Sequence, residues 1–244
     1  MLLTEIYQPR KPKHAAFCFG RFNPPTLGHA LLLNTVASAA KGGDYWIFVS
    51  QSQDPKLNPL GYFEKIDFMQ RMFPQHADHI VVDKNIKTPI DAAKWLYQRG
   101  YTDVTMIAGD DRLKRYKELL VTYNDKPDHW RFRTTKVISS GPRDGDSELS
   151  NVSATKAREF AADNKNPNAS FAKFNKITGA KGQLALQLYQ AVRQGMGILG
   201  EDAAGVGVVA KNKKMARDPR YSTSMTVDVR PDTPNKNLKA FKLI

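Results

Sequence analysis

The chain has 244 residues, of which 41% are apolar and 25% charged, a composition typical of a folded globular protein and unlike that of a disordered one. Lys and Arg total 37 against 24 Asp and Glu, so the formal net charge is +13. This charge is compatible with nucleotides, nucleic acids or an acidic surface as partners, and it does not choose among them. A single cysteine, Cys18, excludes an intrachain disulfide framework and a cysteine-based zinc finger.

Five short apolar runs rich in aromatic and β-branched residues predict buried strands, and helical patterns separate them. The predicted strands are 15–19, 45–50, 79–83, 104–108 and 135–139, and the predicted helices between them are 27–40, 62–73 and 89–99. This alternation is typical of βαβ units, so we expect an α/β fold with a Rossmann-like, doubly wound parallel sheet of about five strands. Ligands bind such sheets beyond the carboxyl ends of the strands.

The last third of the chain has a different character. Helical patterns rich in Asn, Lys and Ala follow residue 158, most clearly at 182–195, and predict a C-terminal helical cap. Residues 211–244 hold nine Lys or Arg and three Asp or Glu, a net +6, and predict an extended basic tail. We therefore expect a main domain at 1–165, a helical segment at 166–200 and a tail at 201–244.

The strongest motif, Gly20-Arg-Phe-Asn-Pro-Pro-Thr-Leu-Gly-His29, follows the first predicted strand and opens the first predicted helix. Gly20 allows a sharp turn, and Gly28 leaves room for a phosphate against the backbone. Unpaired N–H groups at a helix N-terminus attract anions, and His29 adds a donor on the same turn. The segment predicts a phosphate cradle.

This segment resembles the T/HxGH signature of the nucleotidylyltransferase superfamily, in the form GRFxPxTxGH. The resemblance implies a transferase in which Thr26 and His29 act on the transferred phosphate. It also implies that nucleotide is bound by Gly20, Arg21, Phe22, Asn23 and Gly28.

A second motif, Val152-Ser-Ala-Thr-Lys-Ala-Arg158, follows the fifth predicted strand. Ser153 and Thr155 offer hydroxyls at a helix start, and Arg158, one turn further on, can grip a triphosphate with its fork of donors. Alone, this pattern more often indicates helix capping. It resembles the ISxTxxR motif of the same superfamily, which implies that Ser153 and Thr155 bind nucleotide and that Arg158 is catalytic.

A third motif, Met106-Ile-Ala-Gly-Asp-Asp-Arg112, ends the fourth predicted strand and is similar to the GxDR segment of that superfamily. Gly109 permits close backbone approach of a nucleotide, and Asp111 can accept hydrogen bonds from ribose hydroxyls. The alternative is a strand-to-helix turn in which Asp111 caps the next helix.

The segment Ser50-Gln-Ser-Gln-Asp-Pro-Lys-Leu-Asn-Pro-Leu60, followed by Glu64-Lys-Ile66, resembles a loop of nicotinamide-mononucleotide (NMN) adenylyltransferases. The resemblance implies that Ser50, Gln51 and Asn58 lie near the acceptor. Archaeal members stack a tryptophan on nicotinamide near the position of Trp95, although a helical tryptophan with Leu96 and Ala92 nearby more often packs in the core. Thr26 stands where many NMN adenylyltransferases have histidine and phosphopantetheine adenylyltransferases have threonine.

The resemblance implies a reaction in which the phosphate of an acceptor attacks the α-phosphorus of a nucleoside triphosphate and releases pyrophosphate. Transfer of AMP from ATP to NMN, with Mg²⁺ bound to the ATP and no metal held by the protein, is the expected form. Open alternatives are another phosphate acceptor such as phosphopantetheine or a polyol phosphate, CTP in place of ATP, and a non-catalytic protein that binds nucleotide or, through the basic tail, nucleic acid.

The expected setting is the cytoplasm. No stretch reaches the ~18 continuous apolar residues of a membrane span, the N-terminus lacks a signal-peptide layout, and one cysteine suits a reducing compartment. Members of the superfamily are often oligomeric, so a homo-oligomer is compatible with the sequence, which itself carries no interface signal.

Overall fold

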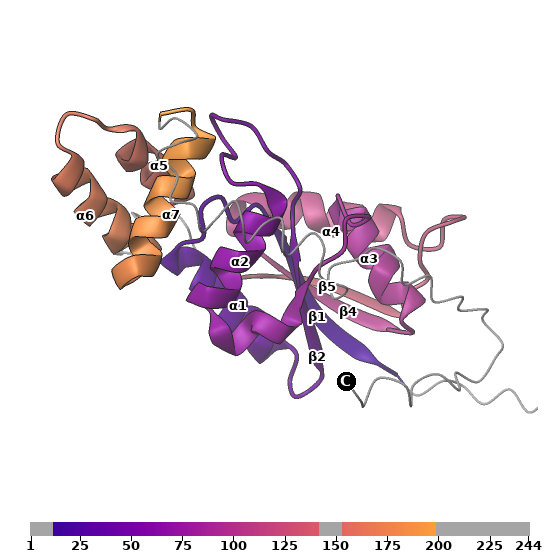
Figure 1. Cartoon of the computed structure of the whole chain (residues 1–244). Helices are drawn as coiled ribbons and strands as arrows, with labels where there is room; N and C mark the ends of the chain where they lie inside the picture. Colours follow the sequence, from indigo (N-terminus) through magenta and orange to yellow (C-terminus); the bar gives the residue numbers. More distant parts are fainter. Residues whose placement is uncertain (1–11, 142–152, 199–244) are drawn as a thin grey trace, which may run out of the picture.

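A computed structural model describes residues 12–141 and 153–198, and these form a five-stranded parallel sheet with helices on both faces (Figure 1). The strand order is β3-β2-β1-β4-β5, and every pair is parallel. The predicted fold class is therefore confirmed. The strands are β1 His14–Gly20, β2 Asp44–Val49, β3 Ile80–Val81, β4 Asp103–Ala108 and β5 Thr134–Ser139.

The helices α1, α2 and α3 were predicted within one residue of their observed ends, but α4 was not predicted. In α4, Tyr116 and Leu120 are buried, and Leu113 and Leu119 pack beside them against the core, an apolar face that the sequence analysis passed over. Two short 3₁₀ helices, η1 and η2, were also missed. The helices are α1 Leu27–Ala39, α2 Tyr62–Met72, η1 Pro74–His79, α3 Pro89–Gln98, η2 Asp110–Arg112, α4 Leu113–Thr122, α5 Ala154–Ala162, α6 Pro167–Thr178 and α7 Gly182–Gly195.

Alternating side chains of the central strand β1 point into two separate cores. Ala15 and Phe17 belong to the cluster under α3 and α4, whereas Ala16 and Cys18 belong to the cluster under α1 and α2. All four side chains are fully buried. A strand that is apolar on both faces is what a sheet covered by helices on both sides requires.

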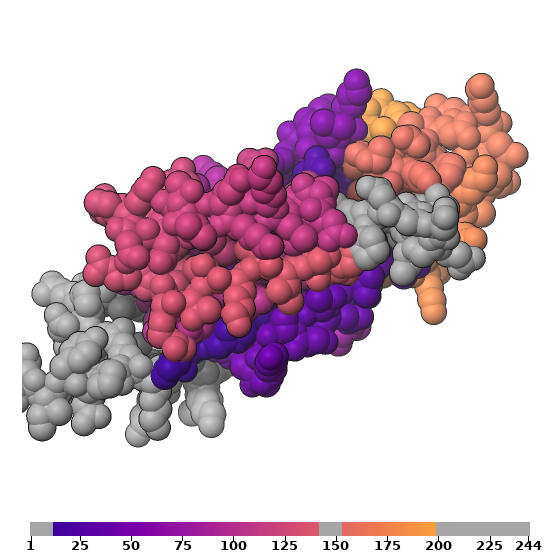
Figure 2. All heavy atoms as spheres, turned by 180° about the vertical axis from the view of Figure 1, so that it is seen from behind, coloured from indigo at the N-terminus to yellow at the C-terminus, as the bar shows by residue number. Residues whose placement is uncertain are grey.

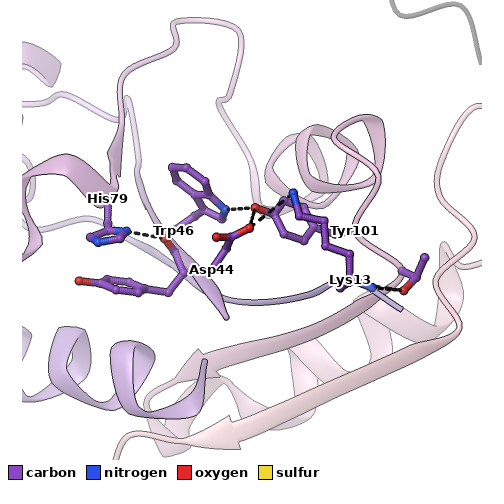
Figure 3. Close-up of polar contacts among 7 residues, drawn as sticks. Lys13, Asp44, Trp46, His79 and Tyr101 are labelled. Atoms are coloured by element: carbon purple, nitrogen blue, oxygen red, sulfur yellow. Dashed lines mark hydrogen bonds and ion pairs between the residues drawn. The ribbon is translucent and has the colours of Figure 1, made fainter. Parts of the chain in front are cut away.

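A polar network closes the amino-terminal end of β2 (Figure 3). The Tyr101 hydroxyl donates to the Asp44 carboxylate at 2.6 Å and accepts from the Trp46 indole N–H at 2.9 Å, while the Lys13 ammonium lies 3.4 Å from the same carboxylate. Burial, together with Asp44, raises the pKa of Tyr101, which therefore stays a neutral donor. The network joins β2 to the segments before β1 and β4, at the end of the sheet opposite the carboxyl ends of the strands.

The helices α5, α6 and α7 pack together at one end of the molecule (Figures 1 and 2). Their shared hydrophobic cluster also contains Leu60 and Phe68, which come from the loop before α2 and from α2 itself. Gly195 lies so close to this loop that a Cβ atom would stand 2.1 Å from the carbonyl oxygen of Pro59. The C-terminal helices therefore pack directly on the segment that follows β2.

The described residues contain no helix that is both long and apolar enough to cross a membrane. The predicted basic tail at 201–244, together with Val152 of the second motif, lies outside the described residues.

Candidate active site

A pocket of about 190 Å³ lies at the carboxyl ends of β1 and β4. It is bounded by the turn from β1 into α1, the loop after β2, the turn after β4 and the start of α5. Most of the predicted site residues come together in its wall. These are Gly20, Arg21, Phe22, Asn23, Thr26, Gly28, His29, Asn58, Gly109, Ser153, Thr155 and Arg158.

In the turn from β1 into α1, the side chain of Phe22 packs tightly against Gly20. The Phe22 side chain is fully buried and its backbone has a positive φ of 47°, a conformation that costs a bulky residue roughly 1–3 kcal/mol. Its ring lies where a Cβ atom on Gly20 would be, at 2.6 Å from that position. Gly20 is therefore needed because the ring of Phe22 folds back over it.

The Asn23 side chain joins this turn to the loop after β2. Its Nδ2 donates to the carbonyl oxygen of Leu60 at 3.0 Å, and its Oδ1 accepts from the Leu60 amide at 3.0 Å. The side chain is 1% exposed. Asn23 lines the pocket as predicted for a nucleotide-binding residue, but its amide group serves to hold two loops together.

The backbone amide of Thr26 selects the tautomer of the neutral His29 ring. The Thr26 amide donates to Nδ1 of His29 at 3.0 Å, and the Thr26 hydroxyl lies at the same distance from this nitrogen. An amide N–H can only donate, so Nδ1 must be an unprotonated acceptor and the neutral ring carries its proton on Nε2. The Phe22 ring, 4.8 Å away between centroids, holds the imidazole in place.

Arg158 reaches back from α5 to the turn from β1 into α1. Its guanidinium donates to the carbonyl oxygen of Asn23 at 2.7 Å and to the hydroxyl of Thr155 at 3.1 Å. The residue is only 8% exposed, and burial, together with the neighbouring Arg21, lowers its pKa from the usual arginine value. A guanidinium has five N–H donors, so donors remain for an anionic ligand.

Ser153 and Thr155 both line the pocket and both have protein partners. The Ser153 hydroxyl accepts from the amide of Lys156 at 3.1 Å and caps α5. The capping alternative considered for this motif is therefore present, on a helix whose N-terminus also faces the pocket wall. A helix N-terminus favours anions nearby.

Two lining residues, Arg112 and Tyr116, were not predicted as site residues. Arg112 belongs to the third motif, in which the sequence directed attention to Asp111; Asp111 instead lies outside the lining and pairs with Arg112 at 3.5 Å. Arg112 ends η2 and Tyr116 lies in the first turn of α4, so selecting them depended on recognising these two helices.

The predicted acceptor residues separate in the structure, because among them only Asn58 lines the pocket. The Gln51 amide group donates to the carbonyl oxygens of Lys84 and Ile86 at 2.8 and 3.0 Å, so it holds the loop after β3. Ser50 is 4% exposed, and its hydroxyl has no hydrogen-bond partner among the described residues. Acceptor contact by Ser50 and Gln51 stays a prediction.

Trp95 packs beside the core under α3 and α4 rather than in the pocket wall. Its ring lies edge-on to Trp46 and Phe48, at centroid distances of 5.2 and 5.4 Å, and the Arg99 guanidinium covers it at 3.5 Å. These contacts match the core-packing alternative, and nicotinamide stacking by Trp95 stays a prediction.

Lys65, which the sequence analysis did not select, is fully buried beneath the loop after β2. Its ammonium donates to the carbonyl oxygens of Ser50 at 2.5 Å and Ser52 at 3.2 Å. Burial lowers the pKa of Lys65 to about 8. The preceding Glu64 accepts from the amide of Gly61 at 2.8 Å and caps α2, so both charged residues of the Glu-Lys-Ile motif shape this loop.

Comparison with solved structures finds matches at low sequence identity. A Plasmodium falciparum nicotinic acid mononucleotide adenylyltransferase complexed with NaAD is 13% identical, with a TM-score of 0.44 over 68% of this chain and 94% of that one. A Plasmodium falciparum nicotinic acid mononucleotide adenylyltransferase complexed with APC is 14% identical, with a TM-score of 0.46 over 72% of this chain and 94% of that one. A putative nicotinate-nucleotide adenylyltransferase from Vibrio parahaemolyticus is 14% identical, with a TM-score of 0.43 over 72% of this chain and 98% of that one.

No curated protein matches the chain. The model of the family described as cytidylyltransferase-like matches residues 17–160, a range that covers β1 through most of α5 and therefore contains the whole pocket wall. The match extends over more than half of the sequence, and the chain belongs to the cytidylyltransferase-like family.

Proposed function

We propose that this member of the cytidylyltransferase-like family transfers AMP from ATP to NMN, forming NAD and releasing pyrophosphate. The observation that carries the proposal is the charge of the pocket wall. It contains His29 and three arginines, Arg21, Arg112 and Arg158, and no Asp or Glu among the described lining residues. Such a surface is complementary to a triphosphate and to the phosphate of an acceptor.

The reaction needs no protein nucleophile, because the acceptor carries its own phosphate oxygen. That oxygen forms a bond to the α-phosphorus, the bond from the α-phosphorus to its bridging oxygen breaks, and pyrophosphate leaves. In the proposed mechanism His29 donates from Nε2 to a phosphate oxygen, and Arg158 donates from its remaining N–H groups. Both stabilise charge that develops during transfer, and the backbone holds both in position beforehand.

Thr26 acts through His29 in this mechanism. Its amide makes Nδ1 an acceptor, which leaves the donor on Nε2. Mg²⁺ enters as part of the substrate MgATP, since the lining offers the hard cation no carboxylate among the described residues. The ion would contribute by neutralising the phosphate oxygens.

The choice of NMN rests on the loop from 50 to 60, where the resemblance to NMN adenylyltransferases lies, and the choice of ATP rests on the same resemblance. Thr26 keeps phosphopantetheine open as an acceptor. An alternative acceptor or CTP would change the substrates and leave the roles of His29 and Arg158 unchanged.

Pyrophosphate release from the purified full chain tests the proposal. ATP or CTP is supplied with Mg²⁺ and one of three acceptors: NMN, nicotinate mononucleotide or phosphopantetheine. We expect release that requires ATP together with NMN, and NAD as the second product. Release with a different pair would refute the NMN assignment and retain the transfer chemistry, whereas no release from any pair would favour a non-catalytic nucleotide-binding protein.

A further inference from the structure

We infer that Asn58 makes this site selective for an acceptor with a neutral carboxamide over one with a carboxylate, by offering it a hydrogen-bond acceptor, Oδ1. The inference rests on the proposed function and names the residue that would separate NMN from nicotinate mononucleotide. These two acceptors differ only in a CONH₂ group against a COO⁻ group on the pyridine ring. A protein atom that accepts but never donates distinguishes them.

The Oδ1 atom of Asn58 is the unusual feature. Asn58 lines the pocket and is 7% exposed, so it is more than nine-tenths buried. Its Oδ1 is buried without a hydrogen-bond partner among the described residues. Leaving such an acceptor unsatisfied is unfavourable, and each case in a native protein calls for an explanation. A donor on a bound substrate supplies one.

Asp54 determines which atom of the Asn58 amide group is left for the substrate. Nδ2 of Asn58 donates to Oδ2 of Asp54 at 2.6 Å. The other carboxylate oxygen accepts from the backbone amides of Leu57 at 2.6 Å and Lys56 at 3.1 Å. These bonds lower the pKa of Asp54, with the Leu57 amide as the largest cause and the Asn58 amide next.

An ionised carboxylate can only accept hydrogen bonds. A flipped Asn58 would place Oδ1 against the Asp54 oxygen, with two acceptors facing each other and no proton between them. The orientation with Nδ2 toward Asp54 is therefore fixed by charge, and Oδ1 is the atom that remains.

The backbone places this pair next to the phosphate-binding residues. Asp54 and Asn58 exchange backbone hydrogen bonds of 3.0 and 3.1 Å, which close the loop between them. Two residues later, Leu60 is held at both its amide and its carbonyl oxygen by Asn23, whose own carbonyl oxygen accepts from Arg158. Asn58 is thereby connected to the turn that presents His29.

The chemistry of the two acceptors then gives opposite results. The carboxamide of NMN donates from its NH₂ group to Oδ1 and relieves the unsatisfied acceptor. The carboxylate of nicotinate mononucleotide has no proton to donate near neutral pH, and its negative charge would meet both Oδ1 and, behind it, the charge of Asp54. Rejection of the wrong ligand by an unmatched polar group is a strong source of specificity.

The test compares kcat/KM for NMN and for nicotinate mononucleotide in wild type and in Asn58→Leu. Leucine has nearly the shape of asparagine and no acceptor atom, so we expect kcat/KM for NMN to fall about tenfold, with the value for nicotinate mononucleotide and the KM for ATP little changed. Asn175→Leu is the matched control, because Asn175 also has a buried Oδ1 without a partner but lies on α6, outside the pocket lining.

A second variant, Asp54→Asn, tests the orientation while keeping the shape of the loop. The new amide NH₂ donates to Oδ1 of Asn58, and Asn58 rotates so that its own NH₂ group is left for the substrate. We expect the preference to move by about tenfold toward nicotinate mononucleotide. This variant also keeps the inference testable if Asn58→Leu fails to fold.

Three outcomes overturn the inference while the proposed function stands: a wild type that prefers the nicotinate acceptor, variants that keep the wild-type ratio, and a loss confined to the KM for ATP, which would assign Oδ1 to the nucleotide. A wild type that transfers AMP to neither acceptor refutes the proposed function, and the inference with it.

Discussion

His29 illustrates how a single backbone amide sets the chemistry of a side chain. Its Nδ1 accepts from the amide of Thr26, so the donor of the neutral ring lies on Nε2. The sequence was sufficient to find this residue, because the whole arrangement is contained in four consecutive positions. The predictions for Thr26, His29 and Gly28 depend on a strand, a turn and a helix start that are all local.

We expect His29→Ala to lower kcat by about 100-fold or more, since it removes a donor that acts on charge developing in the transition state. The midpoint of thermal unfolding should change little, because His29 is partly exposed. Steady-state pyrophosphate release and a melting curve on the same sample check both statements. Near-normal turnover by a folded variant would contradict the role of His29.

Lys65 provides a prediction about pH. Burial lowers its folded-state pKa to about 8, whereas an unfolded lysine titrates near 10.4. Between these values the unfolded chain binds more protons than the folded one, so this group makes the folded state more stable as pH rises. From about pH 8 to about pH 9.5 the gain is about 1.6 kcal/mol, at 1.36 kcal/mol for each pKa unit, because the folded group is already half deprotonated at pH 8.

Urea unfolding of wild type and Lys65→Met over that range measures the effect. Methionine keeps the length of the side chain without the charge, so the rise should disappear in the variant even if its overall stability falls from the loss of hydrogen bonds to Ser50 and Ser52. The pKa of Tyr62 is raised to about 12 by burial, and tyrosines of this kind lower stability only above about pH 10. If the free energy of unfolding changed with pH in the same way for wild type and Lys65→Met, the prediction would be refuted.

Contacts between residues distant in sequence explain what the sequence analysis missed at this scale. Asn23 pairs with Leu60 across 37 positions, and Lys65 reaches back to Ser50. Neither pairing follows from spacing or composition, because each depends on how two loops lie over the edge of the sheet. Asn23 and Gln51 accordingly prove to hold loops together.

At the scale of elements, the existence of each strand was easier to predict than its length. β1 and β4 are apolar on both faces, and their patterns extend over the observed strands. β3 has only two residues, because η1 occupies the chain up to His79 and only Ile80 and Val81 pair with β2. The missed helix α4 has an apolar face, with Leu113, Tyr116 and Leu120 at helical spacing, which the sequence analysis passed over.

The contact between α7 and the loop after β2 gives a prediction at this scale. In Gly195→Ala the new methyl group would meet the carbonyl oxygen of Pro59, and the loop carrying Asn58 would have to move. We expect KM for the acceptor to rise about tenfold with KM for ATP little changed, and stability to fall by about 1–3 kcal/mol. Leu186→Ala, at an exposed site on the same helix, is the control and should leave both KM values unchanged.

Equal effects on the two substrates, or none, would show that α7 does not position the acceptor loop. The measurement is a pair of KM determinations for each protein, with unfolding curves to confirm that both variants are folded.

On the scale of the whole molecule, the buried apolar side chains of the described residues form three hydrophobic clusters. Two clusters cover the faces of the sheet, and the third joins α5, α6 and α7 to Leu60 and Phe68. The predicted boundary between 165 and 166 falls between α5 and α6, which share that third cluster. The division of the chain into a main domain and a helical segment stays a prediction.

The single thiol of the chain lies at the centre of this arrangement. Cys18 is fully buried in β1, and burial raises the pKa of its thiol, so almost no thiolate forms in the folded state. Alkylation by iodoacetamide should therefore proceed only through unfolding. We expect the labelling rate in native buffer to equal the rate for the unfolded chain multiplied by the unfolded fraction, a relation that mass spectrometry can check against denaturant unfolding.

Faster labelling than global unfolding allows would reveal a local opening of the central strand. If the relation holds, the labelling rate of Cys18 reports the unfolded fraction of the molecule without an engineered probe. A cysteine introduced at any exposed position would then react far sooner than Cys18, so spectroscopic labels could be attached selectively to the wild-type background.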